Sequence, residues 1–159
     1  MAYWLVKSEP DECSIDDFAK SSKPIRWDGV RNYQARNFMR EMRTGDQVLL
    51  YHSSCAEIGL AGIISVVKEA YDDPAQFDPA SPYFDAKASI ENPRWSSVDM
   101  VYDSKFKEIV PLAKLKAMPE LEGFLLVGKR GRLSVMPVSE PHWMVLMGVV
   151  SLESRLVNR

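Results

Sequence analysis

The most informative segment of the chain is Trp27-Asp28-Gly29-Val30-Arg31-Asn32-Tyr33-Gln34-Ala35-Arg36-Asn37. It places a tryptophan and an Asp-Gly turn directly before an arginine- and asparagine-rich helical pattern. Tryptophan offers a flat aromatic face, asparagine offers both a donor and an acceptor, and arginine offers a fork of donors for phosphate. Such groups can hold a flipped-out or single-stranded base. The segment also fits a simpler interpretation, in which a core tryptophan and a turn precede a helix with a basic exposed face.

Local patterns on both sides of this segment predict short helices and strands. The helical period continues over residues 32–42 and is ended by Thr44-Gly45-Asp46. Upstream, residues 2–7 are typical of a strand, and Ser14 is expected to cap a short helix through Phe18. Downstream, strands are predicted over residues 48–51 and 60–71. Gly59 and Gly62 indicate a bend, a bulge or the close approach of a ligand backbone at the start of the second strand.

The second half of the chain begins with a loop over residues 72–93 that is rich in Pro, Asp and Ser. Loops of this length are usually functional or disordered. Further elements are then predicted: a strand or bent strand pair over 95–110, a short helix over 112–118, a strand over 133–138 and a C-terminal helix capped from Ser139. Because strands dominate, we expect an α+β fold, a small mixed β barrel with peripheral helices.

The bulk composition is that of an ordinary globular protein. With 159 residues, the chain is long enough to bury a core as one domain over residues 1–159. The net charge of −2 does not indicate nucleic acid, but a local basic patch is still compatible with it. The basic residues gather in two windows: Arg26, Arg31, Arg36, Arg40 and Arg43, then Lys129, Arg130 and Arg132.

The cysteines and the hydropathy of the chain predict the cellular compartment of the protein. Cys13 and Cys55 have no metal-ligand spacing, and a disulfide between them stays open. No targeting segment is evident, and no apolar stretch approaches the length that spans a membrane. We therefore expect a cytoplasmic protein without metal, cofactor or membrane contact.

The sequence contains few candidates for catalysis. It has no phosphate-binding glycine loop, no nucleophile elbow and no HExxH pattern. Glu9 and His52 could form an acid/base pair, although a histidine after a buried strand also fits a hydrogen-bonded wall residue. Lys7-Ser8-Glu9-Pro10 fits either a solvated turn or the mouth of a pocket, where the Glu9 carboxylate could accept from the amine of cytosine. No catalytic residue is predicted.

Several segments, in this order, resemble the EVE domain family. They are Tyr3-Trp4-Leu5-Val6-Lys7-Ser8-Glu9-Pro10, the segment 27–37, Gly45-Asp46, Tyr51-His52-Ser53, Gly59 to Gly62, Asp78-Pro79 with Ser81-Pro82-Tyr83, Asn92-Pro93-Arg94-Trp95, and Arg132-Leu133-Ser134-Val135-Met136-Pro137-Val138. The resemblance runs from about residue 2 to about residue 146.

This resemblance implies a PUA-like β barrel, akin to the YTH domains that read methylated adenine in RNA. It implies binding of a modified base without catalysis, with modified cytosine in DNA (5-methylcytosine) as the leading candidate. Lys7 and Ser8 stand where the YTH domain has its own Lys-Ser, and Trp27 stands where it has its first cage aromatic. The asparagine after that Lys-Ser is Glu9 here, so the contacts to the base edge must differ. Residues 55–58 hold no second cage aromatic, which favours a one-sided stack.

Two sets of site residues follow. The predicted base-binding pocket consists of Lys7, Ser8, Glu9, Trp27, Asn32, His52 and Ser53. The predicted phosphate contacts are Arg31, Arg36, Lys129, Arg130 and Arg132. With so few cations, binding to duplex DNA is expected to be weak and strongly dependent on salt.

Three other classes of function stay open at this point. One is an RNA-binding or RNA-processing protein of the PUA-like class, for example a ribonuclease or base-modifying enzyme that uses Lys7, Glu9 and His52. Another is a module that binds a free nucleotide or a modified tRNA base. The last is a protein-interaction module that uses the 72–93 loop.

Overall fold

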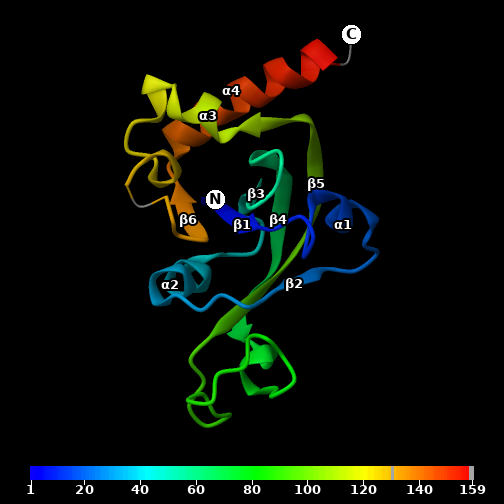
Figure 1. Ribbon diagram of the computed structural model, residues 1–159, viewed down its shortest axis with the longest axis vertical. Helices are drawn as coiled ribbons and strands as arrows, with labels where there is room; N and C mark the ends of the chain where they lie inside the picture. The colour runs from blue at the N-terminus through cyan, green and yellow to red at the C-terminus, as the bar shows by residue number, and fades with distance from the viewer. Residues whose placement is uncertain (130, 158–159) are drawn as a thin grey trace.

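The computed structural model describes residues 1–129 and 131–157, and within them six strands form one mixed sheet (Figure 1). The strands are β1 (Tyr3–Ser8), β2 (Ile25–Trp27), β3 (Gln47–His52), β4 (Gly59–Asp72), β5 (Ser96–Pro111) and β6 (Val135–Val138). Their order in the sheet is β2-β5-β4-β3-β1-β6. β1 and β3 run parallel, whereas the other neighbouring strands are antiparallel. The parallel pair needs a long crossover, which the segment between β1 and β3 supplies.

Helices cover both faces of this sheet. They are α1 (Ile15–Lys20), α2 (Tyr33–Glu41), α3 (Leu112–Lys116) and α4 (Glu140–Val157), with 3-10 turns η1 (Pro74–Phe77), η2 (Pro119–Leu121) and η3 (Leu125–Val127). Successive strand residues point to opposite faces, so Val6 joins the core under α1 and α2, and Leu5 joins the core under α3 and α4. In Figure 1, α3 and α4 lie together at the top, away from α1 and α2.

The expected α+β fold is confirmed as this mixed sheet with helices, but closure into a barrel is not. In the described part of the chain, pairing ends at β2 on one side and at β6 on the other. β2 has only three residues and stops at a turn where Gly29 has a φ of 76°. Such a short strand lacks a recognisable alternating pattern and was not predicted from the sequence.

Helix caps explain why the predicted helices begin where they do. The Ser14 hydroxyl accepts a hydrogen bond from the Asp17 amide, and the Asp17 carboxylate accepts one from the Ser14 amide, which forms a capping box. Asn32 caps α2, since its side-chain oxygen accepts from the Ala35 amide at 3.0 Å. Both helices were therefore predicted from local sequence signals that the structure confirms.

The glycines at the start of β4 allow the close approach of a neighbouring strand. A Cβ atom on Gly59 would lie 2.1 Å from the Val110 carbonyl oxygen, and one on Gly62 would lie 2.4 Å from the Ser104 carbonyl oxygen. The β4–β5 register also shifts between Leu60 and Gly62. The predicted irregularity is confirmed, and the backbone that approaches these glycines is that of β5.

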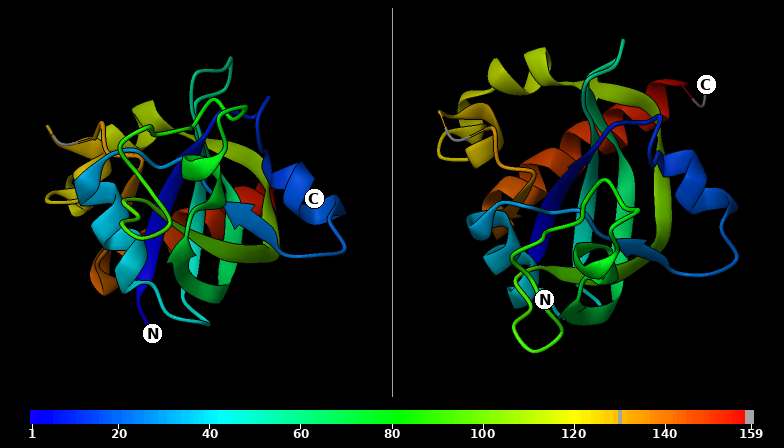
Figure 2. Two further views of the ribbon diagram at one scale, coloured as in Figure 1. Left: turned by 90° about the horizontal axis from the view of Figure 1, so that it is seen from below. Right: turned by 60° about the horizontal axis from the view of Figure 1, so that its bottom comes forward.

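Residues 95–110 fall almost entirely within the single long strand β5, which bends near the top of Figure 1. Before β5, the 73–95 loop (green in Figure 1) lies beyond the end of the sheet that is farthest from α4. Figure 2 brings this loop forward and shows it beside the segment that joins β2 to α2. That contact between distant segments forms the site described next. Among the helices of the described residues, none is both long and apolar enough to cross a membrane.

Candidate nucleic-acid interface

A cleft of about 570 Å³ lies where the turn after β2 meets the end of β1 and the 73–95 loop. Its volume is within the range of small-ligand sites. The lining residues are Lys7, Ser8, Glu12, Cys13, Ile25, Arg26, Trp27, Asp28, Gly29, Val30, Arg31, Pro82, Tyr83 and Ser134. We refer to this feature as the β1–β2 cleft.

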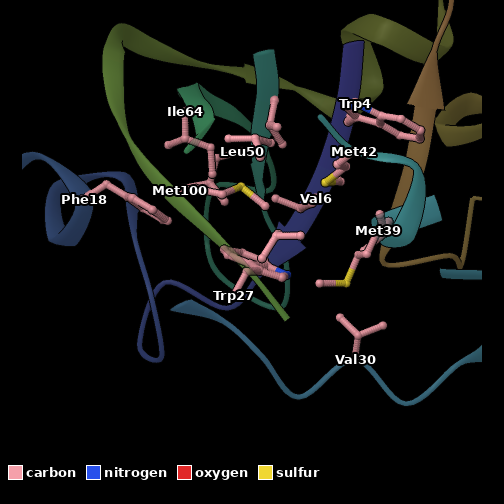
Figure 3. Close-up of a cluster of buried hydrophobic side chains, with 14 of the residues drawn as sticks. Trp4, Val6, Phe18, Trp27, Val30, Met39, Met42, Leu50, Ile64 and Met100 are labelled. Atoms are coloured by element: carbon pink, nitrogen blue, oxygen red, sulfur yellow. The ribbon is translucent and has the colours of Figure 1, made fainter. Parts of the chain in front are cut away.

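Trp27 belongs both to this cleft and to the hydrophobic core. Only 8% of the residue is exposed. Its ring stacks on Phe18 with 6.3 Å between ring centroids and 20° between planes. Figure 3 shows it among Val6, Phe18 and Met100. Trp27 is therefore a core residue and, at the same time, a residue that lines a cleft, so both interpretations of the 27–37 segment apply to it.

The turn after Trp27 brings a carboxylate and an aromatic ring to the cleft. The ring of Tyr83 packs against Gly29 so closely that a Cβ atom there would lie 2.8 Å from it. Asp28 is half-buried, and its nearest ionic partner is the Arg26 Nε at 3.5 Å. Burial, followed by the charge of Asp73, raises the pKa of Asp28. Tyr83 thus forms a second aromatic wall of the cleft, whereas residues 55–58 hold no aromatic residue.

The position of Tyr83 depends on a buried ion pair. Asp73 is fully buried and pairs with Arg31 at 2.9 Å. Its carboxylate also accepts from the Gly29 amide at 3.0 Å. Arg31 in turn donates to the Tyr83 carbonyl oxygen from Nε at 3.0 Å and from Nη2 at 2.7 Å. Arg31 therefore stabilises the cleft. Its guanidinium, which was predicted to bind phosphate, is occupied by these contacts.

The end of β1 contributes two residues that point in different directions. Ser8 is buried, and its hydroxyl donates to the carbonyl oxygen of Cys13. The Lys7 ammonium donates to the Gly131 carbonyl oxygen and lies 5.5 Å from the centre of the Tyr51 ring. Tyr51 belongs to the core on the opposite face of the sheet, so the Lys7 ammonium lies there too. Burial lowers the pKa of Lys7 and raises that of the Cys13 thiol to about 11.

Four residues of the predicted pocket do not line the cleft. Glu9 is exposed, and its carbonyl oxygen accepts from the amides of Glu12 and Cys13. Asn32 is occupied as the cap of α2. The Ser53 amide donates to the Ser8 carbonyl oxygen at 2.9 Å. Of that set, Lys7, Ser8 and Trp27 line the cleft, although the Lys7 ammonium is directed to the opposite face of the sheet. Glu9, Asn32, His52 and Ser53 lie elsewhere.

His52 lines a second cavity of about 900 Å³, together with Asp16 and Lys105. Its Nε2 accepts from the Ile15 amide at 3.2 Å, and burial lowers its pKa. This is the hydrogen-bonded wall residue that the sequence left as an alternative. Within residues 1–129 and 131–157, no group of three or more His, Cys, Asp or Glu residues is placed to hold a metal ion.

Beside the cleft, Tyr33, Arg36, Arg40 and Arg94 lie around the buried ring of Trp95 and form with it what is here called the Arg–aromatic surface. Tyr33 stacks on Trp95 with 4.9 Å between ring centroids. The guanidinium groups of Arg36 and Arg94 lie 4.7 and 5.6 Å from the centre of the Tyr33 ring. Arg31 lies 5.5 Å from the Trp95 ring, which connects this surface to the cleft.

The arginines of this surface differ in their charge partners. Arg94 pairs with Asp85 at 2.9 Å. For Arg36 and Arg40, the described part of the chain places no carboxylate within 4.0 Å. Arg36 donates to the Arg94 carbonyl oxygen, and Arg40 donates through Nε to the Ser96 hydroxyl at 3.0 Å. Burial and the neighbouring charges of Arg40 and Arg94 lower the pKa of Arg36.

Two of the other predicted phosphate contacts, Lys129 and Arg132, lie in the loop before β6. Lys129 and Arg132 are exposed, whereas Arg130 lies outside the described residues. Asp28, Tyr83 and Arg94 had no role predicted from the sequence. Asp28 and Tyr83 stand within segments that resemble the EVE family, but their approach to one cleft depends on contacts between distant parts of the chain.

Comparison with known proteins places this architecture in a family. The EVE domain model matches residues 2–149. The chain is 51% identical to a protein of known structure from Pseudomonas syringae, with a TM-score of 0.91 and coverage of 94% of this chain and 99% of that one. It is 37% identical to human THYN1 protein, solved in complex with DNA containing 5-methylcytosine, with a TM-score of 0.90 and coverage of 94% and 98%.

The full-length human thymocyte nuclear protein 1 is 38% identical, over 97% of this chain and 75% of that protein. A family match across most of the chain and identities above 30% over nearly its whole length agree with each other. The chain belongs to the EVE domain family.

Proposed function

We propose that the β1–β2 cleft binds a modified cytosine in DNA, with 5-methylcytosine as the leading candidate, and that residues 1–159 act as one EVE domain. The observation that carries this proposal is a cleft bordered by two aromatic residues, Trp27 and Tyr83, in a chain whose fold matches that of human THYN1. That relative was solved with DNA containing 5-methylcytosine. A base can enter such a cleft only after it leaves the stack.

The two aromatic residues provide the surface for the base. Stacking of a base on an aromatic ring contributes roughly 1–3 kcal/mol. Burial of one methyl group adds about 0.8 kcal/mol, which corresponds to a preference of about fourfold. Contacts to the methyl group alone therefore give modest discrimination, and polar groups of the cleft must supply the rest.

The Arg–aromatic surface is the proposed path of the flanking strand. Arg36 and Arg40 present guanidinium groups that no carboxylate of the described residues neutralises, and Arg31 and Trp95 connect them to the cleft. Charge-assisted contacts from arginine to phosphate suit this role. Lys129 and Arg132 are a second proposed contact, because their loop continues to Ser134 in the cleft wall.

Binding without catalysis is part of the same proposal. Lys7, Glu9 and His52, the acid/base set of the enzyme alternative, do not converge: the Lys7 ammonium and His52 lie on opposite faces of the sheet, and Glu9 is exposed. The bent sheet would serve as a PUA-like barrel scaffold. The free thiols of Cys13 and Cys55 support a reducing compartment such as the cytoplasm.

A binding panel tests this function. Fluorescence anisotropy is measured with duplex DNA, single-stranded DNA and RNA, each with and without one 5-methylcytosine. We expect tighter binding to methylated DNA than to any unmodified probe. Tyr83→Ala should remove this preference, whereas Tyr102→Ala, an exposed tyrosine on β5 that does not line the cleft, should keep it.

The same panel separates the alternatives. Preference for an RNA probe would replace the DNA assignment with the RNA-binding one. Mass analysis after prolonged incubation of each probe with stoichiometric protein, with and without divalent metal, tests for turnover. A product that increases with protein and is lost in His52→Ala would overturn the assignment as a reader.

A further inference from the structure

We infer that Asp28 makes the β1–β2 cleft selective for a pyrimidine that carries a 4-amino group, so that 5-methylcytosine is accepted and thymine is rejected. In this role the Asp28 carboxylate accepts a hydrogen bond from the exocyclic amine of the base. The inference rests on the proposed function and adds which base edge is read, and by which residue.

The carboxylates around the cleft differ in how many of their acceptor positions are already used. Asp73 is fully buried and accepts from the Gly29 amide, the Ala75 amide and Arg31. Glu12 accepts from the Tyr83 hydroxyl at 3.3 Å.

Asp28 is different, because the only ion pair of its carboxylate within residues 1–129 and 131–157 is a long one with Arg26. Its contact with the Arg26 Nε is 3.5 Å, longer than an ordinary hydrogen bond to nitrogen. Asp28 therefore retains open acceptors at the cleft.

The backbone on both sides of Asp28 is fixed. Trp27 pairs with Val98 in the sheet, and the Gly29 amide is held by Asp73 in a left-handed turn with a φ of 76°. The side chain thus projects from a rigid turn beside the aromatic ring that is proposed to stack on the base. A group positioned in this way can recognise one edge of a bound base with little loss of conformational freedom.

The chemistry of the two bases explains why a carboxylate at this position would distinguish 5-methylcytosine from thymine. Thymine and 5-methylcytosine both carry a methyl group at C5, so a methyl-binding surface cannot distinguish them. They differ at position 4, where cytosine has an amino donor and thymine has a carbonyl acceptor. A carboxylate accepts from the amine and is opposed by the carbonyl oxygen. Sites built around a specific hydrogen bond reject analogues that lack the matching group far more strongly than apolar pockets do.

The test uses duplexes that are identical except for one base, which is placed opposite an abasic site so that the cost of breaking a base pair is the same. The probes contain 5-methylcytosine, thymine or 5-methylpyrimidin-2-one, which lacks the 4-amino group. The parent protein should bind 5-methylcytosine at least about tenfold more tightly than either of the other two. Equal binding of all three would overturn the inference without any variant.

Asp28→Asn is the matching variant, because the amide has the same shape but can present either a donor or an acceptor. It should reduce the preference for 5-methylcytosine over thymine to within about threefold. Asp11→Asn is the control, since it neutralises an exposed carboxylate that does not line the cleft, and it should leave the preference unchanged. Thermal unfolding of each variant shows whether its fold is intact.

The outcomes separate the two proposals. If a folded Asp28→Asn protein keeps the full preference over thymine, Asp28 does not read the base, whereas the assignment as a reader stands. If the parent protein binds methylated and unmodified cytosine equally and no more tightly than thymine, the proposed function itself fails, and with it this inference.

Discussion

At the scale of single residues, Trp27 lies on the boundary between the core and the cleft. Its ring contacts Phe18 on the core side, and the residue borders the cleft beside Asp28. Because the ring is almost completely buried, removing it affects the fold as well as any bound base. A stacking role for Trp27 must therefore be tested with a variant that keeps an aromatic ring.

We expect Trp27→Ala to lower the free energy of unfolding by about 3–5 kcal/mol, because it leaves a large cavity in the core. Phe84→Ala removes a ring of a residue that is 42% exposed and should cost far less. Urea denaturation measures both changes. Similar values for the two variants would show that Trp27 contributes little to core packing. Trp27→Phe is then the variant in which base binding should be measured.

The sequence predicted some residues of the site and missed others for an identifiable reason. Ser8 and Trp27 stand next to strand and turn signals that can be recognised locally. The open acceptors of Asp28 were not recognisable, because the Gly29 amide and Arg31 donate to Asp73, and the Tyr83 hydroxyl donates to Glu12. Those residues are supplied by a loop whose fold has no periodic pattern.

At the scale of elements, α2 presents charges in two different settings. Arg36 and Arg40 are one helical turn apart and lack a carboxylate partner in the described residues, whereas Arg43, just beyond the helix, pairs with Glu69 at 3.3 Å. Neighbouring arginines of similar sequence context thus differ in the charge that is available to a ligand.

If the strand follows the Arg–aromatic surface, Arg36→Gln and Arg40→Gln should each reduce the steepness of the log affinity against log salt plot by about 0.7–0.9. Arg43→Gln is the control and should leave the slope unchanged. Titrations at four salt concentrations provide the slopes. If the slope changes for Arg43→Gln but not for the other two, the strand takes a different path.

A glycine in β4 can be compared with a glycine in α4. Gly59→Ala forces a methyl group against the Val110 carbonyl oxygen, and we expect a loss of about 1–3 kcal/mol in the free energy of unfolding. Gly148→Ala in α4 meets no atom within 4 Å and should raise it by roughly 0.5–1 kcal/mol. Chemical denaturation distinguishes the two signs. Destabilisation by both variants would contradict the space seen at Gly148.

At the scale of the whole molecule, one sheet separates two hydrophobic cores. His52 stands at the end of β3, in the cavity on the α1 side of the sheet. Its ring must stay neutral to accept from the Ile15 amide. The stability of the molecule therefore depends on the protonation of a residue that lies outside the cleft.

Because burial lowers the pKa of His52 below its ordinary value of 6.5, the folded state favours the neutral ring. The stability from this residue is fully present above pH 6.5 and is lost as the pH falls through the lowered pKa. We expect His52→Gln to reduce the fall in unfolding free energy between pH 7.5 and about 4.5. Identical pH profiles of parent and variant would assign the acid sensitivity to other groups.

The sequence by itself determined the elements with local signals and the membership of a family. The cap at Ser14, the helical period of α2 and the glycines of β4 were all predicted from residues close to each other in the chain, because hydrogen bonds and packing within one element depend on neighbours.

The tertiary structure alone decided the sheet order and the composition of the cleft. The ion pair of Arg31 with Asp73 spans 42 positions, and the hydrogen bonds of Arg31 to Tyr83 span 52. These partners meet because β2 pairs with β5, which carries the preceding loop back to the Asp28-Gly29 turn. A short strand and a loop without period give no local indication of such a contact, since its free energy comes from groups that only the folded chain brings together.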